Sequence, residues 1–372
     1  MRKHSIFIVP LFALSLSCIN LQADVSDAQV RSLETRVNAL EQKKGANAMV
    51  NPSGRPQVRD GADLFFTADC LLWQAHENGL GHAIKAEEGQ PLESALYDSS
   101  VKNMDFNWNF GFRVGLGWNT PHDGWDVTTN WTWFKNEANR NSKASSDDIL
   151  LPTNEYAPAN TATGFKHSSD KWRLLLNMID LEMGREFFVS KWMTLRPFIG
   201  LRNAWINQKD TTTFSKPYPT SSSQYSALTR GENNYWGIGP RSGLNTQWGL
   251  GHGFSIFGNA AFSLLYGFFE IEGYQNHKHS AGGSSHSVVS NSDSVRVGRA
   301  VSELALGLRW DTMFASDACH FGIQGGWEHL MFFGQNQFKS FSGTAANNAG
   351  AFFANQGDLT IQGWTLSARL DF

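Results

Sequence analysis

The residues best suited to chemistry are arginines and carboxylates that share one parity of alternating, strand-like stretches. Charges are costly on a lipid-facing surface, so in a membrane barrel this parity must face the interior. Opposed arginines and carboxylates around a lumen create a transverse field that biases ion selectivity. The alternative is that the same groups pair and plug a narrow interior. The candidate lumen-lining set is Arg113, Asp126, Arg196, Arg202, Arg241, Glu303, Arg309, Glu328, Arg369 and Asp371.

Histidines gathered in one polar segment are the other candidates for chemistry. His277, His279 and His286 could supply metal ligands, and Ser280 and Ser287 follow two of them. The flanking glycines and serines indicate a mobile loop without a fixed fourth ligand, and adjacent residues do not form a catalytic triad. The chain also has no phosphate-binding Walker loop, Cys-x-x-Cys or Gly-x-Ser-x-Gly sequence. We therefore expect no enzyme activity, no metal site and no cofactor.

The elements that position these residues are indicated by a period of two. Over residues 106–119, aromatic or aliphatic side chains alternate with Gly, Asn and Arg. The 14-residue length suits a tilted membrane strand better than the usual strand of about five or six residues. Proline removes a ladder donor, so Pro197 and Pro240 weaken two later strands.

Short and long connections alternate between the strands, as expected of an outer-membrane barrel. Short ones lie at 120–124, 187–191, 249–253 and 312–318, and long polar ones at 76–105, 137–168, 210–232, 275–293 and 335–357. The predicted strands are 64–75, 106–119, 125–136, 169–186, 192–209, 233–248, 254–274, 294–311, 319–334 and 358–372. The fold class is therefore an all-β transmembrane antiparallel β-barrel of ten strands, or 12–16 if the long loops hide more.

Composition and the last residue support this fold class. Charged residues are only 17% of the chain, below the roughly 25% of soluble domains, and no apolar run approaches the length of a membrane helix. The final strand alternates and closes on Phe372, a terminal pattern that resembles the assembly signal of outer-membrane barrels. The main alternative is a secreted β-sandwich, which would have to bury strands about twice the usual length.

The N-terminal region predicts export and self-association. Residues 1–23 are typical of a signal peptide, although a cut before Cys18 would make a lipoprotein instead. Residues 24–44 predict a short periplasmic coiled coil, followed by a linker at 45–62 and the barrel at 63–372. The expected oligomerisation residues are Val30, Leu33, Arg36, Val37, Leu40 and Glu41, and the Arg-to-Glu spacing favours a trimer. A lone amphipathic helix is the alternative, since fewer than three heptads are marginal.

Tryptophans, cysteines and charge complete the expectations. Indoles prefer the membrane interface. The expected periplasmic anchors are Trp118, Trp125, Trp192, Trp248 and Trp327.

The mature chain has two cysteines, Cys70 and Cys319, which form one bridge, cross-link chains, or fill space on separate strands. Removing residues 1–23 takes away two bases and changes the net charge from -3 to -5, which disfavours nucleic acid as a partner.

Three segments resemble the major-outer-membrane-protein-like porins of Legionella and of environmental chlamydiae. The first segment reads Asp63-Leu64-Phe65-Phe66-Thr67-Ala68-Asp69-Cys70-Leu71-Leu72-Trp73-Gln74-Ala75-His76-Glu77-Asn78-Gly79-Leu80. The second is 172–185 with Asp180-Leu181-Glu182-Met183-Gly184-Arg185, and the third is the closing strand to Phe372. The resemblance spans the mature chain. It implies a pore-forming outer-membrane barrel and supplies no catalytic residue.

These patterns together predict a passive diffusion channel for ions and small hydrophilic solutes in the bacterial outer membrane. The alternative is a structural or adhesive barrel that binds host or neighbouring surfaces through its outer loops. The expected partners are outer-membrane lipid, the barrel assembly machinery and further copies of the chain.

Overall fold

Ten long antiparallel strands build the protein. The computed structural model describes residues 51–59, 61–87, 99–121, 123–154, 156–157, 164–218, 225–279, 285–341, 343–344 and 352–372. The predicted signal peptide, the predicted coiled coil and residues 45–50 of the linker lie outside the described residues. The long strands are β1 (Leu64–Glu77), β5 (Trp108–Asn119), β6 (Trp125–Lys143), β9 (Gly164–Arg185), β11 (Met193–Tyr218), β12 (Tyr225–Gly251), β13 (Phe254–His279), β14 (Ser285–Phe314), β15 (Cys319–Asn336) and β19 (Gly357–Asp371).

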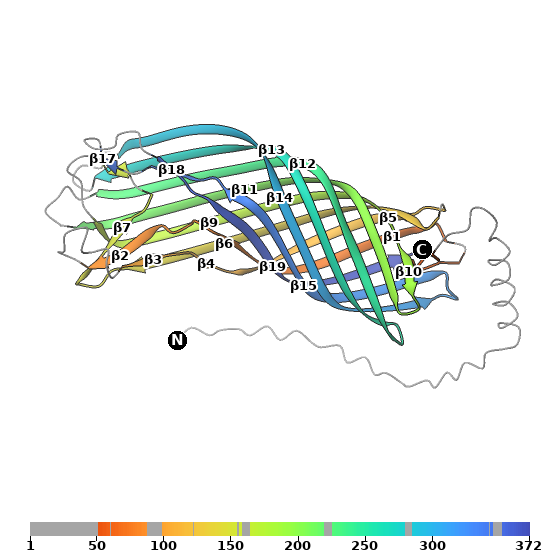
Figure 1. Cartoon of the computed structure of the whole chain (residues 1–372). Helices are drawn as coiled ribbons and strands as arrows, with labels where there is room; N and C mark the ends of the chain where they lie inside the picture. Colours follow the sequence, from red (N-terminus) through yellow and green to blue (C-terminus); the bar gives the residue numbers. More distant parts are fainter. Residues whose placement is uncertain are drawn as a thin grey trace, which may run out of the picture. The chain divides into compact units, whose positions relative to one another are not determined.

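The ten strands close into a barrel because the first pairs with the last. Each strand pairs with its neighbours in chain order, and β1 pairs with β19 from Phe65 opposite Asp371 to Glu77 opposite Leu359. Closure leaves no unpaired edge along the barrel wall, which a lipid environment requires. The ten-strand prediction is confirmed, and the larger count of 12–16 does not apply to the wall (Figure 1).

Short strands add to the barrel, mostly at the end opposite the C-terminus. β2 (Ala83–Glu87), β3 (Ser100–Lys102) and β7 (Asp148–Pro152) extend the sheet, and β4 (Asp105–Phe106) pairs with β6. Two small pairs accompany them: β8 (Tyr156–Ala157) with β17 (Gly343–Thr344), and β16 (Lys339–Phe341) with β18 (Phe352–Ala354). We call this the extended end (Figure 1). β10 (Phe187–Ser190) pairs with β11 at the other end, the short-turn end.

An apolar belt covers the outside of the barrel. Leu304, Leu306 and Leu308 on β14 are about 60% exposed (61%, 60% and 61%), and the other large exposed hydrophobics follow the same parity on neighbouring strands. Such a surface is stable only against lipid hydrocarbon. Among the described residues, no helix is long and apolar enough to span a membrane.

The strands extend well past their predicted ends. Much of the predicted long loops at 137–168, 210–232 and 275–293 is strand, because β6, β9, β11, β12, β13 and β14 continue into them. In the β11–β12 hairpin, Thr211 pairs with Arg230 and Thr213 with Leu228. The polar composition of these segments predicted loops. Antiparallel strands satisfy their backbone hydrogen bonds in water as well as in lipid, however, and threonine favours strands.

Both suspect prolines lie within strands, at places where a missing N–H does little harm. Pro197 on β11 precedes the first pair with β9, Phe198 with Gly184. Pro240 on β12 pairs with Leu201 of β11, while the β12–β13 pairs are interrupted at residues 239 and 240. Each proline therefore lies where the backbone pairing with one neighbouring strand is locally absent, and neither marks the end of a strand.

Candidate functional site: the charged lumen

All ten predicted lumen residues lie inside the barrel. Eight of them line one chamber of about 260 Å3 in its interior: Arg113, Arg196, Arg202, Arg241, Glu303, Arg309, Glu328 and Arg369. Asp126 and Asp371 face the interior as well and pair with Arg196 and Arg369. Alternation fixes this outcome, because the neighbouring positions on each strand face the lipid.

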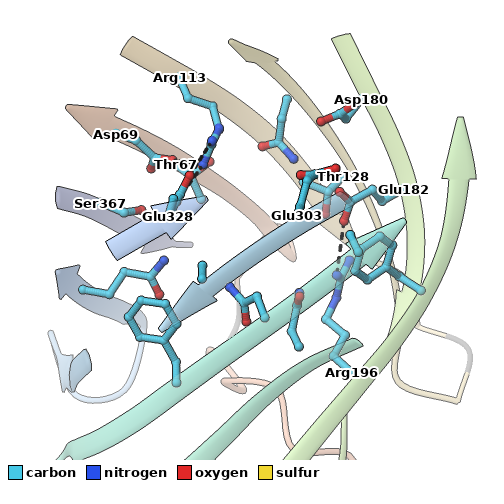
Figure 2. A pocket seen from close by; sticks show the side chains of 18 of the residues that line it. Thr67, Asp69, Arg113, Thr128, Asp180, Glu182, Arg196, Glu303, Glu328 and Ser367 are labelled. Carbon is cyan, nitrogen blue, oxygen red and sulfur yellow. Dashed lines mark hydrogen bonds and ion pairs between the residues drawn. The ribbon is translucent and has the colours of Figure 1, made fainter. Parts of the chain in front are cut away.

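One part of the chamber is organised around Arg113 of β5. Its guanidinium lies 3.0 Å from Asp69 Oδ2 of β1 and 2.9 Å from Glu328 Oε2 of β15. It also lies 5.5 Å from the ring centre of Trp73, a cation–π contact. Figure 2 shows Arg113 directed at these carboxylates, with Arg196 reaching into the chamber from another side. The bonds join strands that are distant in the sequence.

A second part links arginines of β11 and β12 through shared carboxylates. Arg202 Nε and Nη2 each donate to Asp180, at 2.6 Å, and Arg202 also pairs with Glu303 of β14. Arg241 donates to Glu303 Oε2 at 2.9 Å and pairs with Glu182 of β9. Each arginine thus has two carboxylate partners, which accept from donors that burial would otherwise leave without partners.

Arg196 connects this group to the short-turn end. It donates to Asp126 Oδ2 at 2.9 Å and lies 3.4 Å from Glu182 Oε2. Because Glu182 contacts both Arg196 and Arg241, the two arginines share one carboxylate.

A third group lies near the C-terminus. His320 Nδ1 lies 2.7 Å from Asp371 Oδ2, and its Nε2 lies 3.0 Å from Asp311 Oδ1. Arg309 donates to Asp311 at 2.8 Å, and Arg369 donates to Asp371 at 2.6 Å. The histidine therefore bridges two Arg–Asp pairs and ties the last strand to β14 and β15.

Sequence reasoning missed five members of these groups. They are Asp69, Asp180, Glu182, Asp311 and His320. All five lie on the lumen parity of their strands, so the alternation rule that selected the other ten could have found them.

A layer of buried apolar side chains lies inside the barrel between the chamber and the extended end. Its interior side chains come from nine of the ten long strands, with β5 contributing none. The large aromatic members are each at most 1% exposed: Trp73, Phe134, Trp172, Tyr235, Phe269 and Phe332. Some of these rings contact one another, as Tyr235 and Phe269 do with 4.6 Å between their centres, and Trp73 and Phe134 with 5.6 Å. The layer borders the polar chamber directly, because Trp73, Met178 and Leu330 belong to both.

A buried polar cluster lies beyond the layer, toward the extended end. His82 Nδ1 lies 3.1 Å from Asp170 Oδ2, and Ser168 Oγ lies 3.4 Å from His82 Nε2. This order of groups matches a nucleophile, base and acid. However, Ser168 is only 4% exposed and does not line the adjoining pocket of about 60 Å3 that His82 and Asp210 line. The Ser168 hydroxyl is therefore buried away from that pocket.

The predicted tryptophan anchors divide into two groups. Trp118, Trp125, Trp192 and Trp248 lie at or near strand ends beside short turns. Trp327 lies in the middle of β15, its ring centre 5.9 Å from that of Trp108 and 5.5 Å from that of Trp364. The predicted position of Trp327 near a short turn is therefore wrong, because β15 begins eight residues earlier.

The cysteines and loop histidines do not form a site among the described side chains. Cys70 and Cys319 are free thiols on β1 and β15. His277 is buried inside the barrel, and the backbone pairs it with His286. The side chains of His279 and His286 lie outside the described set. Within that set, no group of three or more His, Cys, Asp or Glu could hold a metal ion.

Comparison with known proteins identifies one family. The family model described as Legionella pneumophila major outer membrane protein precursor matches residues 56–372, which confirms the expected resemblance. None of the curated proteins compared with the chain matches it.

Several solved barrels show distant likenesses. The outer membrane protease OmpT from Escherichia coli is 9% identical, with 86% of this chain and 99% of that chain covered and a TM-score of 0.39. A Pseudomonas aeruginosa FadL homologue is 9% identical, with 84% and 90% covered and a TM-score of 0.26. The P. putida toluene transporter TodX is 7% identical, with 87% and 93% covered and a TM-score of 0.27. At these scores the likenesses carry no inference about this chain's activity.

Proposed function

The chain belongs to the family of the Legionella pneumophila major outer membrane protein, and from that premise we propose that it is a structural surface barrel of the bacterial outer membrane. Its lumen is closed at rest, and its extended end faces outward to contact neighbouring or host surfaces. The role is non-enzymatic and needs no cofactor.

The apolar layer is the observation that carries this proposal. A diffusion channel for hydrophilic solutes needs a water-lined path, because an ion pays a high cost to enter an apolar region. The layer instead buries Trp73, Phe269 and Phe332 in the interior, each at most 1% exposed.

A diffusion channel is the second candidate, and the chamber favours it. Arg113, Arg196 and Arg241 and their carboxylate partners line a cavity of about 260 Å3, and charged groups around a lumen are expected of a charge-selective channel. This role requires the apolar layer to open. The proposed partners are the same for both roles: outer-membrane lipid, the barrel assembly machinery and further copies of the chain.

Single-channel conductance separates the two roles. The mature chain, residues 24–372, is refolded in detergent, its folding is verified by heat-modifiable gel migration, and it is added to a planar bilayer. A closed surface barrel stays silent. Stepwise conductance proportional to salt would contradict the closed lumen and establish the channel.

A pair of matched variants tests whether the layer is the barrier. We expect Phe269→Ala with Phe332→Ala to conduct, because both rings fill the lumen cross-section. The control is Phe110→Ala with Phe262→Ala, which removes two lipid-facing rings that are 70% and 51% exposed. The control pair should remain silent.

A further inference from the structure

A cluster of basic side chains marks the outer edge of the apolar belt on one side of the barrel. Lys135 of β6 and Lys171 and Arg173 of β9 face outward, with side chains 52%, 43% and 50% exposed. Their neighbours on the same strands, Phe134 and Trp172, face the lumen and are fully buried. We call these three bases, together with Glu137, the edge cluster.

The three bases converge on one point. Lys135 Nζ and Lys171 Nζ each lie 3.2 Å from an oxygen of Glu137, and Arg173 Nε lies 3.7 Å from it. In the described part of the chain, the ion pairs of these bases all go to Glu137. Three positive charges around one carboxylate leave a net charge of +2. Glu137 is thus held by cationic donors from two adjacent strands, and the exposed parts of the three bases remain accessible to a second anion.

The position of the edge cluster relates it to the membrane. On the same outward faces, toward the short-turn end, lie the belt residues Trp131, Ile179 and Leu181, all exposed. Beyond the cluster, toward the extended end, the outward positions are polar, as at Asn139 and Asn141. The cluster therefore lies at the head-group level, where basic side chains meet the phosphates of anionic lipids.

We infer that the edge cluster binds a phosphorylated glycolipid head group of the outer leaflet. Its phosphate accepts charge-assisted hydrogen bonds from Lys135, Lys171 and Arg173 while its acyl chains lie along the belt. The bound lipid would then pack against one flank of the barrel. This inference rests on insertion with the extended end outward, and it is independent of whether the lumen is closed.

Native mass spectrometry of the folded mature chain in detergent measures the binding directly. Diphosphoryl lipid A is the probe, and phosphatidylcholine is the reference lipid without net charge. We expect wild type to retain lipid A in preference to phosphatidylcholine. The combined variant Lys135→Gln, Lys171→Gln and Arg173→Gln should bind lipid A about 100-fold more weakly, at roughly fivefold per base.

Two further variants make the result specific. Lys191→Gln removes an exposed base at the short-turn end, next to Trp192, and should leave lipid A binding unchanged. Glu137→Gln removes the competing carboxylate, so lipid A should bind more tightly. Heat-modifiable migration verifies that each variant is folded.

Three outcomes would overturn the inference: equal lipid A retention by the combined variant, weaker binding by Glu137→Gln, or displacement of lipid A by an equal concentration of inorganic phosphate. The last would indicate a site for a bare anion. Bilayer conductance does not enter this assay, so a conducting wild type would remove the closed-lumen proposal and leave the lipid site standing.

Discussion

At the residue scale, the chamber depends on ion pairs between its arginines and carboxylates. Arg202 is 1% exposed and holds Asp180 and Glu303 together. Removing one partner from such a group leaves uncompensated buried charge, which costs far more than an exposed pair contributes.

We therefore predict that Arg202→Met destabilises the barrel by about 3–5 kcal/mol, because Asp180 and Glu303 lose a shared cation. Urea unfolding in detergent, followed by heat-modifiable migration, measures the change. The matched control is Arg140→Met, whose partner Asp105 is largely exposed, and it should cost less than about 1 kcal/mol. Equal losses in the two variants would refute the distinction between lumen and surface pairs.

His82 is a residue whose ionisation opposes folding. It lies in the loop between β1 and β2, outside the membrane-spanning part, and burial lowers its pKa from 6.5 to about 4. Nearby Asp210 opposes this shift, and Arg140 adds to it. The fold therefore favours the neutral ring.

The pH dependence follows from that direction. The stabilisation from neutral His82 is fully present above pH 6.5 and is lost as the pH falls toward 4, because the unfolded chain takes up the proton first. We predict that wild type loses stability over this range relative to His82→Gln, measured by urea midpoints at pH 7.5, 6 and 4.5. Parallel curves for the two proteins would show that His82 does not titrate as inferred.

At the scale of elements, the strands divide into a lipid-crossing half and a water-exposed half. β9 has exposed Ile179 and Leu181 toward one end and exposed Arg173 toward the other. Cross-strand pairing continues through both halves, so ladder hydrogen bonds set strand length, while outward side chains set the part that crosses lipid.

The predicted coiled coil is the element that would govern assembly. Val37 and Leu40 belong to its apolar seam, with Arg36 and Glu41 placed to pair between helices. We propose that it trimerises the barrel, and we predict that replacing Val37 and Leu40 with Ser yields monomers on native gels. An equivalent double change to Ser at Val25 and Ala28, near the start of the segment, is the control. An oligomer that survives the Val37 and Leu40 changes would exclude the stalk.

At the scale of the whole barrel, closure brings the chain's two distant ends into one structure. β1 and β19 pair along their length, and Arg113 of β5 reaches Glu328 of β15, 215 positions later in the chain. The chamber thus exists only in the closed barrel. The layer has the same dependence, since nine strands each contribute one to four apolar side chains to it.

The sequence alone determined the barrel's wall. Alternation over 106–119 and its repeats located ten strands and assigned Arg113, Arg202 and Arg241 to the interior, because a period of two leaves each side chain only two faces and lipid excludes charge from one. It could not mark strand ends in polar segments such as 210–232, because buried inward positions there include Thr212 and Ala227, which do not stand out as apolar against their polar neighbours.

Only the tertiary structure decided what fills the lumen. Trp73, Phe134 and Phe269 share the lumen parity with the arginines, and a local pattern cannot tell whether such rings from different strands meet at one level. Strand tilt and register bring them together as a layer, just as they bring Glu303 between Arg202 and Arg241. Lumen facing is a local property of each strand, whereas an open or closed lumen depends on side chains from nearly all strands meeting at the same height.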